Sequence, residues 1–140
     1  MLSEAGIPVG VLVAPCIPGI TDHEMPAILK AAVEAGAKWA GYVMLRLPYG
    51  VKDLFEQWVQ QHFPDRAEKV LNRIRSMREG KLYDATWGDR MRGYGIFAEQ
   101  MEQMFKVACK HAGIDPQFRA ELTTEHFCVP REPSPQMELL

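Results

Sequence analysis

The segment from Gly6 to Pro48 decides the fold; it reads GIPVGVLVAPCIPGITDHEMPAILKAAVEAGAKWAGYVMLRLP. Apolar residues at 8–14 and at 39–45 predict two strands, and the segment between them predicts a helix that ends at Gly36. Neither strand alternates between apolar and polar residues, which is typical of parallel strands that are covered on both faces. The segment therefore predicts one β-α-β unit of an α/β fold.

Polar residues and a proline mark the start of the central helix. Thr21 and Glu24 have the spacing of a capping box. Pro26 is tolerated only in the first turn, so we expect the regular helix to begin a residue or two after the cap. Four apolar residues at helical spacing predict its buried face: Ile28, Leu29, Ala32 and Ala35.

A repeated tripeptide supports the α/β interpretation. Glu4-Ala5-Gly6 recurs thirty positions later as Glu34-Ala35-Gly36. About thirty residues is the length of one strand-plus-helix step, and a glycine commonly ends a helix. We therefore expect the first copy to be the last turn of a helix, and the chain to begin inside a repeating α/β domain.

Beyond Gly50 the apolar spacing becomes purely helical and predicts three helices, separated by Pro64-Asp65 and by an irregular segment at 81–95. Their predicted buried residues are Val51, Leu54, Phe55, Trp58, Val59 and His62 in the first, Ala67, Val70, Leu71, Ile74 and Met77 in the second, and Phe97, Met101, Met104, Phe105, Ala108 and Ala112 in the third.

The chain divides into a β-α-β unit (1–50), helices that pack on it (51–113) and a proline-rich tail (114–140). Two strands are too few for a parallel sheet. We therefore expect either the C-terminal portion of a larger, TIM-type barrel or a sheet that is completed by self-association.

The composition of the 140 residues excludes some classes of protein. The net charge is −2, so no overall basic balance favours nucleic acid. Residues 66–92, however, hold eight basic and four acidic residues, a local charge of +4. That segment predicts either a solvated helix face or a basic surface for nucleic acid.

The three cysteines, Cys16, Cys109 and Cys128, form no C-x-x-C pair, so they do not predict a zinc site or a redox dithiol. Sparse cysteines are typical of a reducing compartment. No apolar run has the roughly 20 residues of a membrane span, and no signal peptide is readable. The sequence predicts a cytoplasmic location and no membrane partner.

Ligands of parallel α/β folds bind at the C-terminal ends of the strands. Here those ends are the loop 14–19 and the segment 46–48. Backbone groups near Gly19 could meet a ribose or an anion, or the glycine could simply turn the chain. Arg46 must reach solvent, an acidic partner or a ligand. Cys16 is more simply a buried thiol than a nucleophile.

A second candidate site is the segment Gly88 to Gly95, where Arg90 and Arg92 stand between glycines. Two arginines can bind the phosphate or carboxylate of a substrate. The alternative is an ordinary loop that is held by Asp84 or Asp89.

Several segments together resemble the late part of a radical SAM barrel. They are Gly6 to Pro15, Ile17-Pro18-Gly19, Asp22-His23-Glu24, Pro26 to Leu29, Gly41-Tyr42-Val43, Leu45 to Pro48, Phe63 to Arg66, Arg73 to Arg78 and Gly88 to Gly95. The nearest group is the bacterial radical SAM proteins related to spore photoproduct lyase, often called DNA repair lyases.

The resemblance implies S-adenosylmethionine and a [4Fe–4S] cluster as cofactors of the full-length family. It also implies that the strand ends hold the adenosyl part of the cofactor. The residues so implied are Val13, Ala14, Pro15, Gly19, Arg46, Leu47 and Pro48. The C-x-x-x-C-x-x-C motif that holds the cluster is absent. We therefore expect no cluster, no metal ligand and no catalytic residue on this chain alone.

The sequence thus predicts the C-terminal part of a radical SAM enzyme, inactive by itself, whose partner is the missing N-terminal half of the barrel or a second copy. Two alternatives stay open. One is a stand-alone interaction or nucleic-acid-binding module that uses the basic segment 66–92. The other is a folded fragment without activity.

Overall fold

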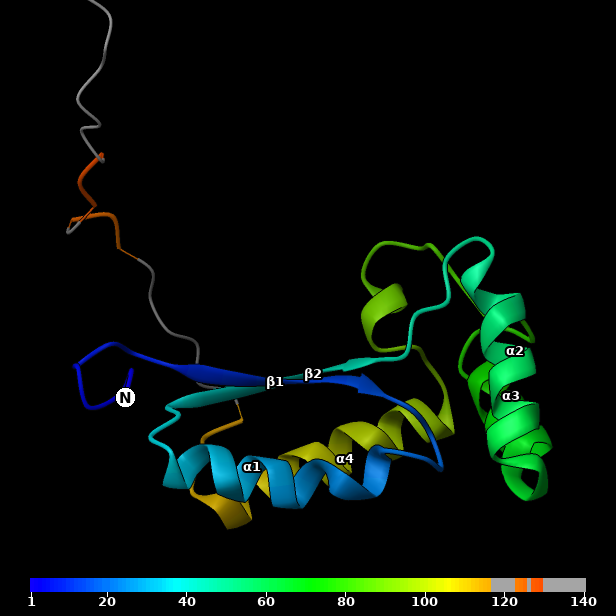
Figure 1. Cartoon of the computed structure of the whole chain (residues 1–140), viewed down its shortest axis with the longest axis horizontal. Helices are drawn as coiled ribbons and strands as arrows, with labels where there is room; N and C mark the ends of the chain where they lie inside the picture. The colour runs from blue at the N-terminus through cyan, green and yellow to red at the C-terminus, as the bar shows by residue number, and fades with distance from the viewer. Residues whose placement is uncertain (117–122, 126, 130–140) are drawn as a thin grey trace, which may run out of the picture.

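The structure is a computed structural model that describes residues 1–116, 123–125 and 127–129. The described part is a mixed α/β fold with one two-stranded parallel sheet and four α-helices (Figure 1). The strands are β1 (Gly10–Cys16) and β2 (Trp39–Met44), and the helices are α1 (Met25–Glu34), α2 (Val51–His62), α3 (Pro64–Ser76) and α4 (Ile96–Ala112). Most of the predicted tail, 114–140, lies outside the described residues.

The first strand is longer at its C-terminal end than predicted. We expected it to end before Pro15, yet β1 continues to Cys16, which is paired with Met44. A bulge between Val13 and Cys16 lets the ladder pass the proline, which has no N–H to donate. The ladder then resumes, because Leu45 N–H donates to Cys16 O at 2.9 Å.

Both copies of the Glu-Ala-Gly tripeptide form the same C-terminal turn, as predicted. In the first, Ile7 N–H donates to Leu2 O at 3.1 Å; in the second, Ala37 N–H donates to Ala32 O at 2.9 Å. This is the Schellman pattern, which needs a left-handed residue before the donor. Gly36, with a φ of 93°, supplies it at the end of α1.

The predicted capping box is wrong. Thr21 Oγ1 accepts from Ile17 N–H at 2.9 Å and donates to Pro15 O at 3.2 Å, so it braces the preceding loop. A short 3₁₀ turn, η1 (Asp22–Glu24), follows, and α1 begins at Met25. The proline therefore lies inside the first turn of α1, where its missing N–H costs nothing.

The buried face of α1 is rotated from the predicted one. Met25 and Leu29 are fully buried and Val33 packs against them, whereas Ile28 is partly exposed. The predicted Ile28 and Ala32 lie one position before the observed Leu29 and Val33, and the prediction left out Met25, the residue before Pro26.

The core consists of two clusters. The first lies between the sheet, α1 and α4: Val13, Cys16, Met25, Leu29, Ala40, Tyr42, Met44, Met77, Ala98, Met101, Phe105, Ala108, Cys109 and Ile114. The second joins α2 and α3 to the segment after β2: Leu47, Phe55, Val59, Ala67, Val70, Leu71 and Ile74. All five residues predicted for α3 are buried. In α2 only two of the predicted residues are buried, because just one side of that helix packs on α3.

Only one face of the sheet is covered by helices, since α1 and α4 both lie on the same side of it (Figure 1). On the other face Leu12 is 63% exposed and Ala14 is exposed. The prediction that both faces are covered is therefore wrong for the described residues. No helix among them is long and apolar enough to cross a membrane.

Candidate functional site at the strand ends

The two predicted cofactor segments start side by side. Parallel strands end at the same edge of a sheet, and the hydrogen bond from Leu45 N–H to Cys16 O joins the two strands at that edge. The loop after β1 then runs toward α1, while the segment after β2 runs toward α2 on the other side (Figure 1). The edge itself is therefore where one ligand could contact both segments.

The apolar residues of the predicted site differ in what they offer a ligand. Val13 turns its side chain into the first cluster, and Leu47 is buried in the second. Ala14 and Pro15 are exposed, and Pro48 is half-buried. These last three residues present apolar surface at the edge, whereas the first two only support it.

The loop that contains Gly19 is folded on itself. The Gly19 N–H donates to Asp22 Oδ2 at 2.8 Å, so this donor is already used. A Cβ at this position would stand 3.0 Å from Arg73 Nη1, which shows how closely the loop packs on α3. Nearby, Pro18 lines a cavity of about 150 Å³ between this loop, α3 and α4.

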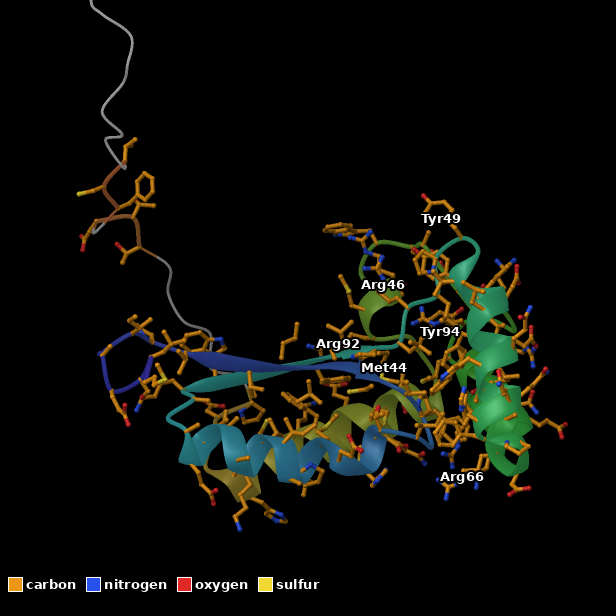
Figure 2. All side chains as sticks on the ribbon, viewed as in Figure 1. Met44, Arg46, Tyr49, Arg66, Arg92 and Tyr94 are labelled. Atoms are coloured by element: carbon orange, nitrogen blue, oxygen red, sulfur yellow. The ribbon has the colours of Figure 1, made fainter. Side chains whose placement is uncertain are left out.

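Arg46 stands at the edge with an unused donor. Its Nη1 lies 3.9 Å from Met91 Sδ, and its Nε is buried without a hydrogen-bond partner among the described residues. Figure 2 shows Arg46, Arg92 and Tyr94 above the end of the sheet, with Arg66 at the far end of α3. A ligand at the edge could accept a hydrogen bond from Arg46.

Arg78 is a feature that the sequence analysis missed. It is 1% exposed, and its Nη2 donates to Leu45 O at 2.7 Å and to Arg90 O at 3.4 Å. Burial lowers the pKa of its guanidinium. Its position four residues after Ile74 continues the buried side of α3, and that spacing was the available signal.

The two arginines of the second candidate site do not point at one place. The Arg90 guanidinium lies 4.3 Å from the centre of the Trp87 ring, and that of Arg92 lies 4.8 Å from the centre of the Tyr42 ring. Asp84 accepts hydrogen bonds from the N–H and hydroxyl of Thr86, which lower the pKa of its carboxyl. Each arginine therefore lies against a different aromatic ring, whereas Asp84 is bonded to Thr86.

The cysteines do not fit an iron–sulfur cluster. Cys16 Sγ donates to Val13 O at 3.4 Å, and burial raises the pKa of this thiol to about 11. Cys109 is also buried in the first cluster, and burial raises its pKa as well. Among the described residues no group of three His, Cys, Asp or Glu side chains lies close enough together to hold a metal ion.

Comparisons with models of protein families, with curated proteins and with solved structures give no match for this chain.

Proposed function

We propose that this chain forms the C-terminal part of a radical SAM enzyme of the group related to spore photoproduct lyase, and that the edge of the sheet forms part of its S-adenosylmethionine pocket. The observation that carries the proposal is the pairing of β1 and β2, which brings loop 14–19 and segment 46–48 to one edge. The bare apolar face of the sheet supports it, because the strands of a barrel have helices on one face and the barrel interior on the other.

In this proposal Ala14, Pro15 and Pro48 provide an apolar surface for the adenine, and the guanidinium of the half-buried Arg46 donates to the ribose or the carboxylate of the cofactor. Bound together with a cluster, the cofactor would supply radical chemistry that abstracts hydrogen from a substrate. The cysteines that hold the cluster would come from the N-terminal half of the barrel. The enzyme would be located in the cytoplasm. The chain alone binds the cofactor weakly.

Calorimetric titration with S-adenosylmethionine tests the pocket. Arg46→Ala removes a hydrogen bond from a charged donor, so we expect about a tenfold or greater loss of affinity. Arg66→Ala is the matched control, because Arg66 is an exposed arginine near the N-terminal end of α3, far from Arg46 and the edge of the sheet (Figure 2). Equal affinity of the wild type and Arg46→Ala would contradict the assignment.

Anaerobic reconstitution with iron and sulfide tests the proposal that the cluster ligands lie outside this chain. Three closely spaced thiolates are needed to hold a cluster with one open iron, and Cys16 and Cys109 are protonated and buried. We expect no visible absorbance from a cluster on the isolated chain. A stoichiometric cluster would overturn the proposal that its ligands lie elsewhere.

A second candidate function is binding of single-stranded nucleic acid. Trp87 is 83% exposed and lies beside Arg90, the aromatic-and-basic pairing on which bases stack. Because Arg66 lies far from Arg92 (Figure 2), this surface would be the segment 87–92 rather than all of 66–92. Fluorescence anisotropy with a labelled oligonucleotide should show weaker binding by Trp87→Ala and retained binding by Trp87→Phe.

A further inference from the structure

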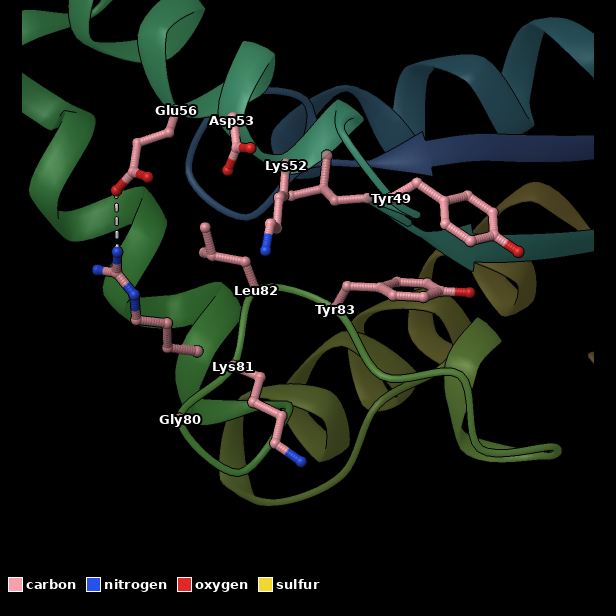
Figure 3. A pocket seen from close by; sticks show the side chains of 10 residues that line it. Tyr49, Lys52, Asp53, Glu56, Gly80, Lys81, Leu82 and Tyr83 are labelled. Atoms are coloured by element: carbon pink, nitrogen blue, oxygen red, sulfur yellow. Dashed lines mark hydrogen bonds and ion pairs between the residues drawn. The ribbon is translucent and has the colours of Figure 1, made fainter.

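A cavity of about 480 Å³ lies between the N-terminal half of α2 and the turn that follows α3 (Figure 3). Its size falls in the range of small-molecule sites. Its lining residues combine two aromatic rings, two leucines and five charged side chains: Leu47, Tyr49, Lys52, Asp53, Glu56, Arg75, Gly80, Lys81, Leu82 and Tyr83.

One end of the cavity is aromatic. Figure 3 shows the phenol rings of Tyr49 and Tyr83 at the same end. Tyr83 packs against the second cluster, whereas Tyr49 is 92% exposed. Tyr49 also has a φ of 51°, in the left-handed region that glycine adopts more easily. A strained backbone that holds a large ring in solvent adds nothing to the core, and such features concentrate at ligand sites.

The other end of the cavity is charged. Glu56 is paired with Arg75 at 3.0 Å, which neutralises both. The remaining charged side chains of the lining are Lys52, Asp53 and Lys81, with a net charge of +1. Figure 3 shows the Lys52 ammonium group and the Asp53 carboxylate on the side away from the tyrosines, with Leu82 beside the lysine. The ammonium group of Lys52 is therefore placed to meet an anion.

We propose that this cavity binds a planar aromatic ring that carries an anionic group, which is the chemistry of a nucleotide. The ring stacks on Tyr49 and Tyr83 above the apolar side chains of Leu47 and Leu82. The phosphate lies against Lys52, and Asp53 accepts a hydrogen bond from an amino or hydroxyl group of the ligand. The proposal does not rest on the function proposed above, since Arg46 and loop 14–19 do not line this cavity.

Titration with AMP tests the proposal, and adenosine and inorganic phosphate separate its two parts. Stacking of one base is worth about 1–3 kcal/mol, so we expect Tyr49→Ala to weaken AMP binding by about tenfold and Tyr49→Phe to preserve it. Lys52→Met should lower the affinity for AMP to that for adenosine. Phe127→Ala is the control, because Phe127 is an exposed ring that does not line the cavity.

A short single-stranded oligonucleotide distinguishes the two sources of such a ligand. Binding tighter than that of AMP, with the same loss in Tyr49→Ala, would identify a nucleotide within a strand; tighter binding of AMP would identify a free nucleotide. No binding of AMP, or AMP binding that Tyr49→Ala leaves unchanged, would overturn the proposal. Loss of S-adenosylmethionine binding in Arg46→Ala but not in Tyr49→Ala would show that the edge of the sheet and this cavity are separate sites.

Discussion

At the scale of single residues, Arg78 links parts of the molecule that are far apart in sequence. From the end of α3 its guanidinium reaches the carbonyl of Leu45, just after β2, and the carbonyl of Arg90, in the irregular segment. Its Nε and Nη1 are buried without partners among the described residues. The side chain therefore combines a strong bond to the strand end with the cost of a buried charge.

Two substitutions of Arg78 separate the packing of its side chain from its polar interactions. We expect Arg78→Ala to lower the free energy of unfolding by about 3 kcal/mol, because it leaves a void and an unpaired carbonyl. Arg78→Met removes the same bonds and the same charge but fills most of the space, so its loss should be only about 1 kcal/mol. Urea denaturation measures both, with the exposed Arg66→Met as control. An equal loss in the two Arg78 variants would show that filling the space contributes nothing to stability.

Cys16 makes stability depend on pH in the alkaline range. Its thiol pKa rises from 9.0 to about 11 on folding, so the folded protein holds a proton that the unfolded chain has lost. The stabilisation is complete below pH 9 and is lost as the pH rises toward 11. We expect the urea midpoint to fall across this window, and Cys16→Ala to make the fall shallower. A fall of the same steepness in the variant would assign it to other groups, such as Tyr42, whose pKa burial also raises.

At the scale of elements, the sequence predicted what local chemistry decides. The stripe of α3 and the two Glu-Ala-Gly turns follow from spacing and from glycine, and both are present. The capping box failed because Thr21 found a partner in the preceding loop, a choice that only the folded loop determines. At the candidate site, the adjacency of the two strand ends followed from the β-α-β pattern. The burial of Arg78 could have been read from its spacing after Ile74, but its partners and the cavity beside Tyr49 depend on how distant segments pack, which no local pattern encodes.

The irregular segment after α3 is held in place by a close backbone contact at Gly93. A Cβ on this residue would stand 3.0 Å from Met77 O, and its φ is 72°. We expect Gly93→Ala to lower the melting temperature more than Gly88→Ala does. Gly88 also has a positive φ, but a Cβ there meets nothing within 4 Å. Gly88→Ala therefore measures only the cost of placing alanine in this backbone conformation. Equal shifts, measured by circular dichroism, would show that the contact relaxes freely.

At the scale of the whole molecule, the sheet is covered on one face and both strands have an outer edge without a neighbour among the described residues. Exposed apolar faces and free edges favour association. Leu12 is a large apolar side chain on the bare face, where it is 63% exposed.

We expect the chain to self-associate, and Leu12→Glu to weaken this association without lowering thermal stability. Ile96→Glu is the matched control, because Ile96 is 72% exposed at the start of α4 and away from the sheet. Sedimentation velocity over a range of concentrations measures the effect. A monomer at all concentrations would show that the face is stable in water.

The division of the core into two clusters has a consequence for the motions of the protein. The hairpin of α2 and α3 buries its apolar residues mainly on itself and on the segment after β2, while the sheet, α1 and α4 share the other cluster. Units with separate cores can open separately. Backbone amides of α2 should therefore exchange with solvent deuterium through a partial opening that leaves the amides of α4 protected. The hairpin would then act as a hinged cover over the strand ends, admitting a ligand without unfolding of the sheet.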